Sequence, residues 1–246
     1  TNVKVGASDG AAGDAFGFSV SISGIYAVVG APSADPHYTN AGAAYVFKLE
    51  DGTWTEKQKI TASNLSAGDQ FGHDVDIYND IIVVSALLDD SNGTDAGSAY
   101  VFERSDETWT ETQKIISSDG DSGDHFGRSV SVDGNIIAIG ANDNAAKASG
   151  SGAVYIFEKQ CEGKKWNQTN KIFPSDGAAD DSFGYDVSLD SRTLAVSATG
   201  VSSDTGAVYV YERKNTNTWI FIEKLVADDA AAADSFGSSV GIFANN

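Results

Sequence analysis

A pair of residues, Phe followed by Gly, recurs five times along the chain at nearly equal intervals. The pairs begin at Phe16, Phe71, Phe126, Phe183 and Phe236, so the spacings are 55, 55, 57 and 53 residues. An Asp stands two residues before each Phe, a Val stands four residues after it, and each of the four complete repeats holds one Trp. This phasing restricts the chain to architectures that stack one supersecondary unit several times.

Each repeat predicts four strands. In the first repeat the candidate segments are FGFSVSI, YAVVGA, AAYVFK and WTEKQKI, and clusters of Gly, Asp, Asn and Ser separate them. The period of two and the β-branched and aromatic residues indicate strands, and four strands per repeat indicate a propeller blade. We therefore predict an all-β fold, a β-propeller of four-stranded antiparallel blades. The strand after Phe-Gly should be innermost, and the Trp-containing strand should lie at the outer edge.

The repeat also predicts the domain organisation, which is a single propeller domain over residues 1–246. It contains four complete blades plus two terminal single strands. The expected blades are about 16–60, 71–116, 126–173 and 183–226, and the expected terminal strands are 2–7 and 236–243.

Two interpretations of the terminal strands remain open. The strands could pair and close a ring with a reduced fifth blade, or the chain could be part of a longer propeller or assemble with other copies. We favour the second interpretation, because missing middle strands would leave a gap in the ring. Open propeller ends present unpaired strand edges, so we also expect self-association through them.

The phrase FGFSVSISGIYAVVGAP followed by GAAYVF resembles the FG-GAP repeat, the blade of integrin α-subunit propellers. The variant with a Trp-containing outer strand, found in tandem in many microbial and marine proteins, is the most similar. Only Gly30-Ala31-Pro32 fits the second part of the motif, and the other repeats depart from it. The resemblance implies a calcium loop between the first and second strands. Here those hairpins read SGIY, YNDI, DGNI and DSRT, too short and too poor in acids for six to eight oxygen ligands.

Composition excludes several classes of partner. The formal net charge is -19 and the pI is near 4.2, so nucleic acid and bare membrane are unfavourable partners. The chain has no apolar run of transmembrane length, and we expect no direct membrane insertion. Because the chain begins with Thr1 rather than Met, we interpret it as a mature, trimmed or excised product.

The Asp residues gather in two sets of loops that an antiparallel meander places on one face. The loops entering each first strand and the loops joining second to third strands hold 18 of the 26 Asp residues, no Glu, and Lys147 as their one Lys or Arg. Asp residues two positions before Phe fix tight turns through side-chain bonds to backbone N–H groups. These repeat-turn residues are Asp14, Asp69, Asp124, Asp181 and Asp234.

A cation site is the alternative role for the same loops. Carboxylates that are close together repel, and a divalent ion such as Ca²⁺ would relieve that repulsion. The candidate metal ligands are Asp119, Asp121, Asp124, Asp176, Asp180 and Asp181. The turn role remains the favoured interpretation of the phased Asp residues.

Three sequons, at Asn64, Asn92 and Asn167, predict N-glycosylation and fit an extracellular protein, either secreted or at the cell surface. The repeated Trp and Tyr residues could stack on carbohydrate, but their recurrence at one strand position favours packing between blades.

No nucleophile elbow, zinc motif or phosphate loop occurs, and the three His residues fall at different positions of the repeat. We therefore expect no enzyme. The favoured function is an extracellular adhesion or protein-interaction module that binds a partner through its acidic loop face. A lectin-like carbohydrate-binding propeller is the alternative, so the ligand is a protein or a glycan. A non-catalytic propeller of a larger hydrolase is the second alternative.

Overall fold

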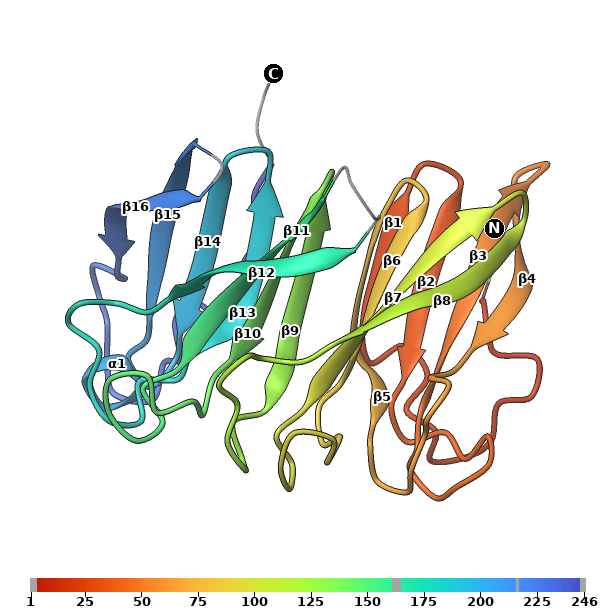
Figure 1. Cartoon of the computed structure of the whole chain (residues 1–246), viewed down its shortest axis with the longest axis horizontal. Coiled ribbons are helices and arrows are strands. Elements are labelled where there is room, and N and C mark those ends of the chain that lie inside the picture. The colour runs from red at the N-terminus through yellow and green to blue at the C-terminus, as the bar shows by residue number, and fades with distance from the viewer. Residues whose placement is uncertain (1–3, 161–164, 216, 244–246) are drawn as a thin grey trace.

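The computed structural model describes residues 4–160, 165–215 and 217–243, and these fold into four antiparallel sheets of four strands each (Figure 1). Strand order in each sheet follows chain order, so each sheet is a meander built from one repeat. The predicted all-β fold of four-stranded blades is confirmed. We call the sheets blades one to four in chain order.

The first two blades have strands of similar length at matching positions. Blade one consists of β1 (Val20–Ser23), β2 (Tyr26–Ala31), β3 (Ala43–Glu50) and β4 (Thr53–Ile60). Blade two consists of β5 (Phe71–Tyr78), β6 (Ile81–Ala86), β7 (Ser98–Ser105) and β8 (Thr108–Ile115).

The last two blades repeat this arrangement. Blade three consists of β9 (Phe126–Asp133), β10 (Ile136–Ala141), β11 (Ala153–Lys159) and β12 (Trp166–Ile172). Blade four consists of β13 (Phe183–Asp190), β14 (Thr193–Ala198), β15 (Ala207–Asn215) and β16 (Thr218–Leu225). Among the described residues the one helical element, α1 (Val201–Asp204), is a single turn in the loop between β14 and β15.

The blades lie side by side in an open row, with blade one and blade four at its two ends (Figure 1). Strands β1, β5, β9 and β13 line a channel of about 960 Å³, so the strand after Phe-Gly is innermost, as the repeat predicts. The row is not closed, and the consequence is visible at equivalent positions. Val75 is 4% exposed against the preceding blade, whereas Val20, which has no preceding blade, is 62% exposed.

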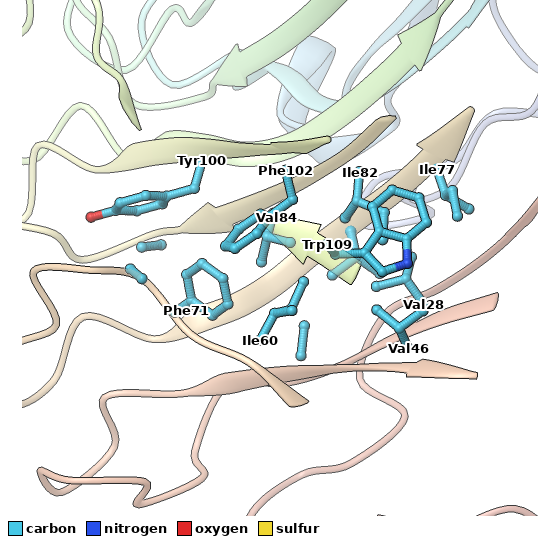
Figure 2. Packing of buried hydrophobic residues seen from close by; sticks show 14 of the residues in the cluster. Val28, Val46, Ile60, Phe71, Ile77, Ile82, Val84, Tyr100, Phe102 and Trp109 are labelled. Atoms are coloured by element: carbon cyan, nitrogen blue, oxygen red, sulfur yellow. The ribbon is translucent and has the colours of Figure 1, made fainter. Parts of the chain in front are cut away.

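Apolar side chains from neighbouring blades form the core between them. Figure 2 shows the contact of blade one with blade two, where Val28 and Val46 meet Ile82 and Val84. The ring of Phe71 packs edge-on against Tyr100 at 5.5 Å between centroids. Burial of such side chains stabilises each by about 1.5–3 kcal/mol, so the blades hold one another together.

The Phe-Gly pair connects each blade to the one before it. The Phe71 N–H donates to the Ala41 carbonyl at 2.9 Å, and equivalent bonds connect Phe126 to Ala96 and Phe183 to Ser151. This close approach requires a glycine immediately before each third strand. A Cβ on Gly42 would lie 2.0 Å from the Phe71 carbonyl oxygen.

The chain ends differ from the prediction of two terminal strands. Residues 2–3 lie outside the described part of the chain, and residues 4–7 form no strand. Phe236 makes an isolated bridge with Gly206, and residues 237–243 form no strand. No strand of the described residues pairs with residues 237–243 to supply a ladder. Instead, the N–H groups of Val240 and Ile242 donate to side-chain oxygens of blade four.

Candidate functional site

Both sets of Asp-rich loops lie on one face of the row. Backbone bonds join them across blade boundaries: the Gly68 N–H donates to Thr39 at 3.0 Å, and the Gly123 N–H donates to Thr94 at 2.9 Å. These loops occupy the lower side of Figure 1, and the short hairpins within each blade occupy the upper side. We call the lower side the acidic loop face.

The phased Asp residues before Phe-Gly all make the same turn. The carboxylate of each accepts the N–H of the residue three positions earlier, at 2.7–2.9 Å. They are Asp14, Asp69, Asp124, Asp181 and Asp234. This geometry closes the loop that leads into each innermost strand, which is a structural task.

A second set of acids on this face is paired with lysines. Asp119 accepts a bond from the Tyr155 hydroxyl at 2.9 Å and forms an ion pair with Lys171 at 2.8 Å. Burial opposes ionisation, but the Lys171 ammonium and the Tyr155 hydroxyl more than offset it and lower the pKa of the Asp119 carboxyl. Blades one and four contain the same cluster around Asp9 and Asp176.

Blade two has Asn64 where the other blades have this Asp. The Tyr100 hydroxyl still bonds the Asn64 side chain, at 2.9 Å. Lys114 instead pairs with Asp89 at 2.7 Å, and Asp89 is only 2% exposed. In blade two the lysine therefore pairs with a different Asp, and this ion pair is buried within the loop.

The structure does not gather the six candidate metal ligands into one site. Asp119 and Asp176 are held by lysines, and Asp124 and Asp181 are held by turn N–H groups. Nowhere in residues 4–160, 165–215 and 217–243 do three or more His, Cys, Asp or Glu side chains form a group that could hold a metal ion.

The remaining acids of the face point their charge to solvent. They are exposed, or nearly so, and take part in no ion pair with another described residue. They are Asp35, Asp90, Asp95, Asp121, Asp180, Asp204, Asp228 and Asp229. This arrangement produces a negative potential over the face, which favours positively charged partners.

The repeat analysis missed a second acidic group, on the innermost strands. The Asp74 carboxylate accepts the Ser19 hydroxyl of blade one at 2.6 Å and the Val130 N–H of blade three at 2.7 Å. Burial raises the pKa of Asp74 to about 6. Asp76 and Asp186 bridge neighbouring blades in the same way. Their polar side chains alternate with apolar ones along the innermost strands, which is the signal that could have identified them.

A positively charged side chain, that of Arg128, lies where the channel opens toward the acidic loop face. The Arg128 guanidinium lies 4.0 Å from the centre of the Tyr185 ring and donates to His73 Nε2 at 3.2 Å. Burial, and next the Arg128 charge, lower the pKa of His73 to about 4. His73 is therefore neutral at physiological pH and accepts the bond.

The three sequons differ in their surroundings. Asn64 and Asn167 are exposed, whereas Asn92 is half-buried. The Nδ2 atom of Asn92, to which a glycan would attach, donates to the Ser117 carbonyl at 3.1 Å. Of the three, Asn92 is therefore the least suited to modification.

The aromatic residues that recur in every repeat serve the core. Trp109 and Trp166 are each 2% exposed, and Tyr45, Tyr100, Tyr155 and Tyr209 are buried. Trp109 and Trp166 are therefore closed to a carbohydrate ligand, whereas Trp54 and Trp219 are partly exposed.

Comparison with protein families matches the chain to the family described as FG-GAP repeat, at residues 2–47, 54–102, 109–157, 166–211 and 219–246. Each central match begins on the outer strand of one blade and ends on the third strand of the next. A search of curated proteins finds no match. No helix among the described residues is long and apolar enough to cross a membrane.

Proposed function

The chain belongs to the FG-GAP repeat family, and from this premise we propose that it is a non-catalytic, extracellular adhesion module that binds a partner protein through its acidic loop face. FG-GAP repeats indicate a propeller-type protein-interaction module. The adhesive role, the extracellular location and the choice of face are our proposal.

The observation that supports this face is its set of exposed carboxylates outside ion pairs. The opposite face also carries acids, but several of them are neutralised: Lys48 pairs with Glu50 and Glu107, and Arg104 pairs with Asp80. A negative face accelerates association with a basic surface and favours basic partners over acidic ones. The partner we propose is therefore a protein with a Lys- and Arg-rich patch.

The test compares two double variants with the same change of net charge. Asp121→Asn with Asp180→Asn removes two charges from the acidic loop face, and Asp51→Asn with Asp106→Asn removes two charges from hairpins on the opposite face. The probe is an oligolysine peptide, and its binding is measured by surface plasmon resonance at two salt concentrations. We expect the first double variant to bind more weakly than the parent and the second to bind like the parent. Equal weakening of both would mean that only net charge matters, and would overturn the proposal.

Calcium is part of the proposal as a cation that bridges the loop face and its partner. The same binding measurements, and melting curves, are repeated with added calcium and with EDTA. We expect calcium to raise the melting temperature of the parent more than that of Asp121→Asn with Asp124→Asn. An unchanged parent would remove calcium from the proposal, and an equal shift in both proteins would place the ion elsewhere.

A further inference from the structure

The contact between blades three and four departs from the pattern of the other blade contacts at the outer rim. The position three residues before Lys59, Lys114 and Lys171 holds Glu56, Glu111 and Gln168 in the first three blades. Each of these side chains accepts the N–H of a Ser in the loop before its own blade; for Glu111 the partner is Ser63, whose N–H and hydroxyl donate at 2.8 and 2.9 Å. Blade four has Phe221 at this position.

Phe221 leaves the corresponding serine, Ser175, without this partner. Its side chain has no oxygen, and no other described residue supplies one to the N–H and hydroxyl of Ser175. Phe221 instead turns toward Tyr211, with ring centroids 5.9 Å apart, and remains 54% exposed.

A second substitution loosens the same contact. Gln58 and Gln113 each pair with the backbone of the next blade's Trp: the Gln113 Nε2 donates to the Trp166 carbonyl at 2.7 Å, and its Oε1 accepts the Trp166 N–H at 2.8 Å. The third blade has Asn170, one methylene shorter. Its Nδ2 donates to the Asn217 carbonyl at 3.0 Å, and its buried Oδ1 has no hydrogen bond within the described structure.

Together the two substitutions open a pocket of about 590 Å³ between β12 and β16. Its apolar wall consists of the rings of Phe173, Tyr209, Tyr211, Trp219 and Phe221. Its polar wall contains Asn170, Ser175 and the ion pair of Asp176 with Lys224. The matched tryptophans Trp109 and Trp166 are almost fully buried, whereas Trp219 is partly exposed.

The free polar groups define the chemistry of the ligand. Asn170 Oδ1 lacks a donor but is buried, so a ligand reaches it only when the Asn170 side chain turns toward the pocket, whereas Ser175 is exposed and its N–H needs an acceptor. A carboxylate could serve Ser175 but not Asn170, and Asp176 would repel it. A purely apolar side chain would leave both groups unsatisfied in a desolvated site, which is unfavourable. A sugar hydroxyl donates and accepts, and a pyranose ring also has an apolar face that packs on aromatic rings.

We propose that this pocket binds one neutral pyranose unit of a carbohydrate, with the sugar ring against the Phe221 and Trp219 side and its hydroxyls toward Asn170 and Ser175. The site goes beyond the proposed function, because it lies at the outer rim between two blades rather than on the acidic loop face. A module with both sites would hold a protein and a glycan at separate surfaces.

The test restores the pattern of the other blades. Phe221→Glu supplies the carboxylate that Ser175 lacks and removes one aromatic wall. The Glu side chain should therefore occupy the polar side of the pocket without loss of stability. The probes are the methyl glycosides of glucose, galactose, mannose and N-acetylglucosamine, with glucuronate as the acidic comparison. Binding is measured by saturation-transfer NMR and by Trp fluorescence. Ile222→Glu is the control, because Ile222 lies on the same strand, is exposed and does not line the pocket.

We expect at least one neutral glycoside to bind the parent and Ile222→Glu equally, and Phe221→Glu to bind it at least about tenfold more weakly. The melting temperature of Phe221→Glu should equal or exceed that of the parent. Absence of binding by every neutral glycoside, binding of glucuronate alone, or unchanged binding by Phe221→Glu would each overturn the proposal. These measurements use no basic probe, so a negative result would not bear on the proposed binding of a basic partner at the acidic loop face.

Discussion

The carboxylate of Asp74 accepts the backbone N–H of Val130 at 2.7 Å and thereby joins the innermost strand of blade two to that of blade three. The same carboxylate accepts the Ser19 hydroxyl of blade one at 2.6 Å. One side chain therefore connects three blades around the channel, in a place where neighbouring strands share no ladder.

Asp74 predicts an unusual pH dependence of stability. Burial raises its pKa to about 6 from an ordinary value of 3.8, so the folded state binds the proton more tightly than the unfolded state. The contribution of this group to the free energy of unfolding should therefore rise as the pH falls from about 7 through 6 toward 4, by about 1–2 kcal/mol. Urea denaturation of the parent and Asp74→Asn across this range checks it, since the variant cannot titrate there. Parallel pH profiles would contradict the assignment.

The contact between Gly42 and the Phe-Gly pair predicts a strong glycine requirement. A Cβ on Gly42 would meet the Phe71 carbonyl oxygen at 2.0 Å, and the backbone there has φ +88°. We expect Gly42→Ala to lower the free energy of unfolding by about 3 kcal/mol or more. Gly24→Ala is the matched control, because its φ is +60° but no atom lies within 4 Å of the new Cβ, and it should cost about 1 kcal/mol. Similar losses of unfolding free energy for both variants in urea denaturation would show that the positive φ, and not the contact with Phe71, causes the destabilisation.

The glutamine near the end of the outer strand in blades one and two is predicted to stabilise the blade contact. Gln58 makes two bonds with the backbone of Trp109, both at 2.8 Å. Gln58→Ala leaves both backbone groups unpaired and should cost about 1–3 kcal/mol. Asn170→Ala removes the residue at the matching position, which makes no such pair, and should cost less than half as much. Chemical denaturation measures both, and equal costs would refute the proposed role of the pair.

Asp89 is predicted to be the most sensitive acid of the loop face. It is buried and accepts bonds from Lys114 and from the Tyr100 hydroxyl. Burial raises the pKa of this carboxyl, but Lys114 and Ser91 more than offset it, so the net effect is a lowered pKa. Its stabilising contribution is therefore present above pH 3.8 and lost as the pH falls through the lower folded value.

Asp89→Asn should lower the free energy of unfolding by about 2–4 kcal/mol at neutral pH, and the difference from the parent should shrink in acid. Asp90→Asn is the control, since Asp90 is exposed and outside any ion pair among the described residues; it should stay within about 0.5 kcal/mol of the parent. Equal effects in thermal unfolding would show that burial of the pair is unimportant.

The open end of the row predicts self-association. Val20 and Ile22 are 62% and 63% exposed, whereas their equivalents Val75 and Ile77 are each 4% exposed. We expect the parent to associate as its concentration rises, and Val20→Lys with Ile22→Lys to reduce this. Tyr38→Lys with Ile116→Lys adds the same charge at exposed apolar positions away from the channel strands and should associate like the parent. Sedimentation velocity checks this, and a strictly monomeric parent would contradict it.

The sequence alone determined the repeat, the four strands of each blade and their order from the channel outward. These follow from local rules: the period of two selects strands, and Gly and Asp select turns. A meander also places alternate loops on one face, so the position of the Asp-rich loops could be predicted. The turn role of Asp14 could be inferred for the same reason, because its partner N–H lies only three residues away.

Tertiary structure decided the features that depend on contacts between repeats. Asp119 is paired with Lys171, 52 residues away, and Asp74 reaches Val130, 56 residues away, so neither partner could be identified from local sequence. The segment 237–243 has the alternating pattern of a strand, but no strand in the described part of the chain pairs with it. Phe221 is an ordinary strand residue in the sequence. Only its position opposite Ser175 makes it one wall of a pocket, because the free energy of a side chain depends on what packs against it across the blade boundary.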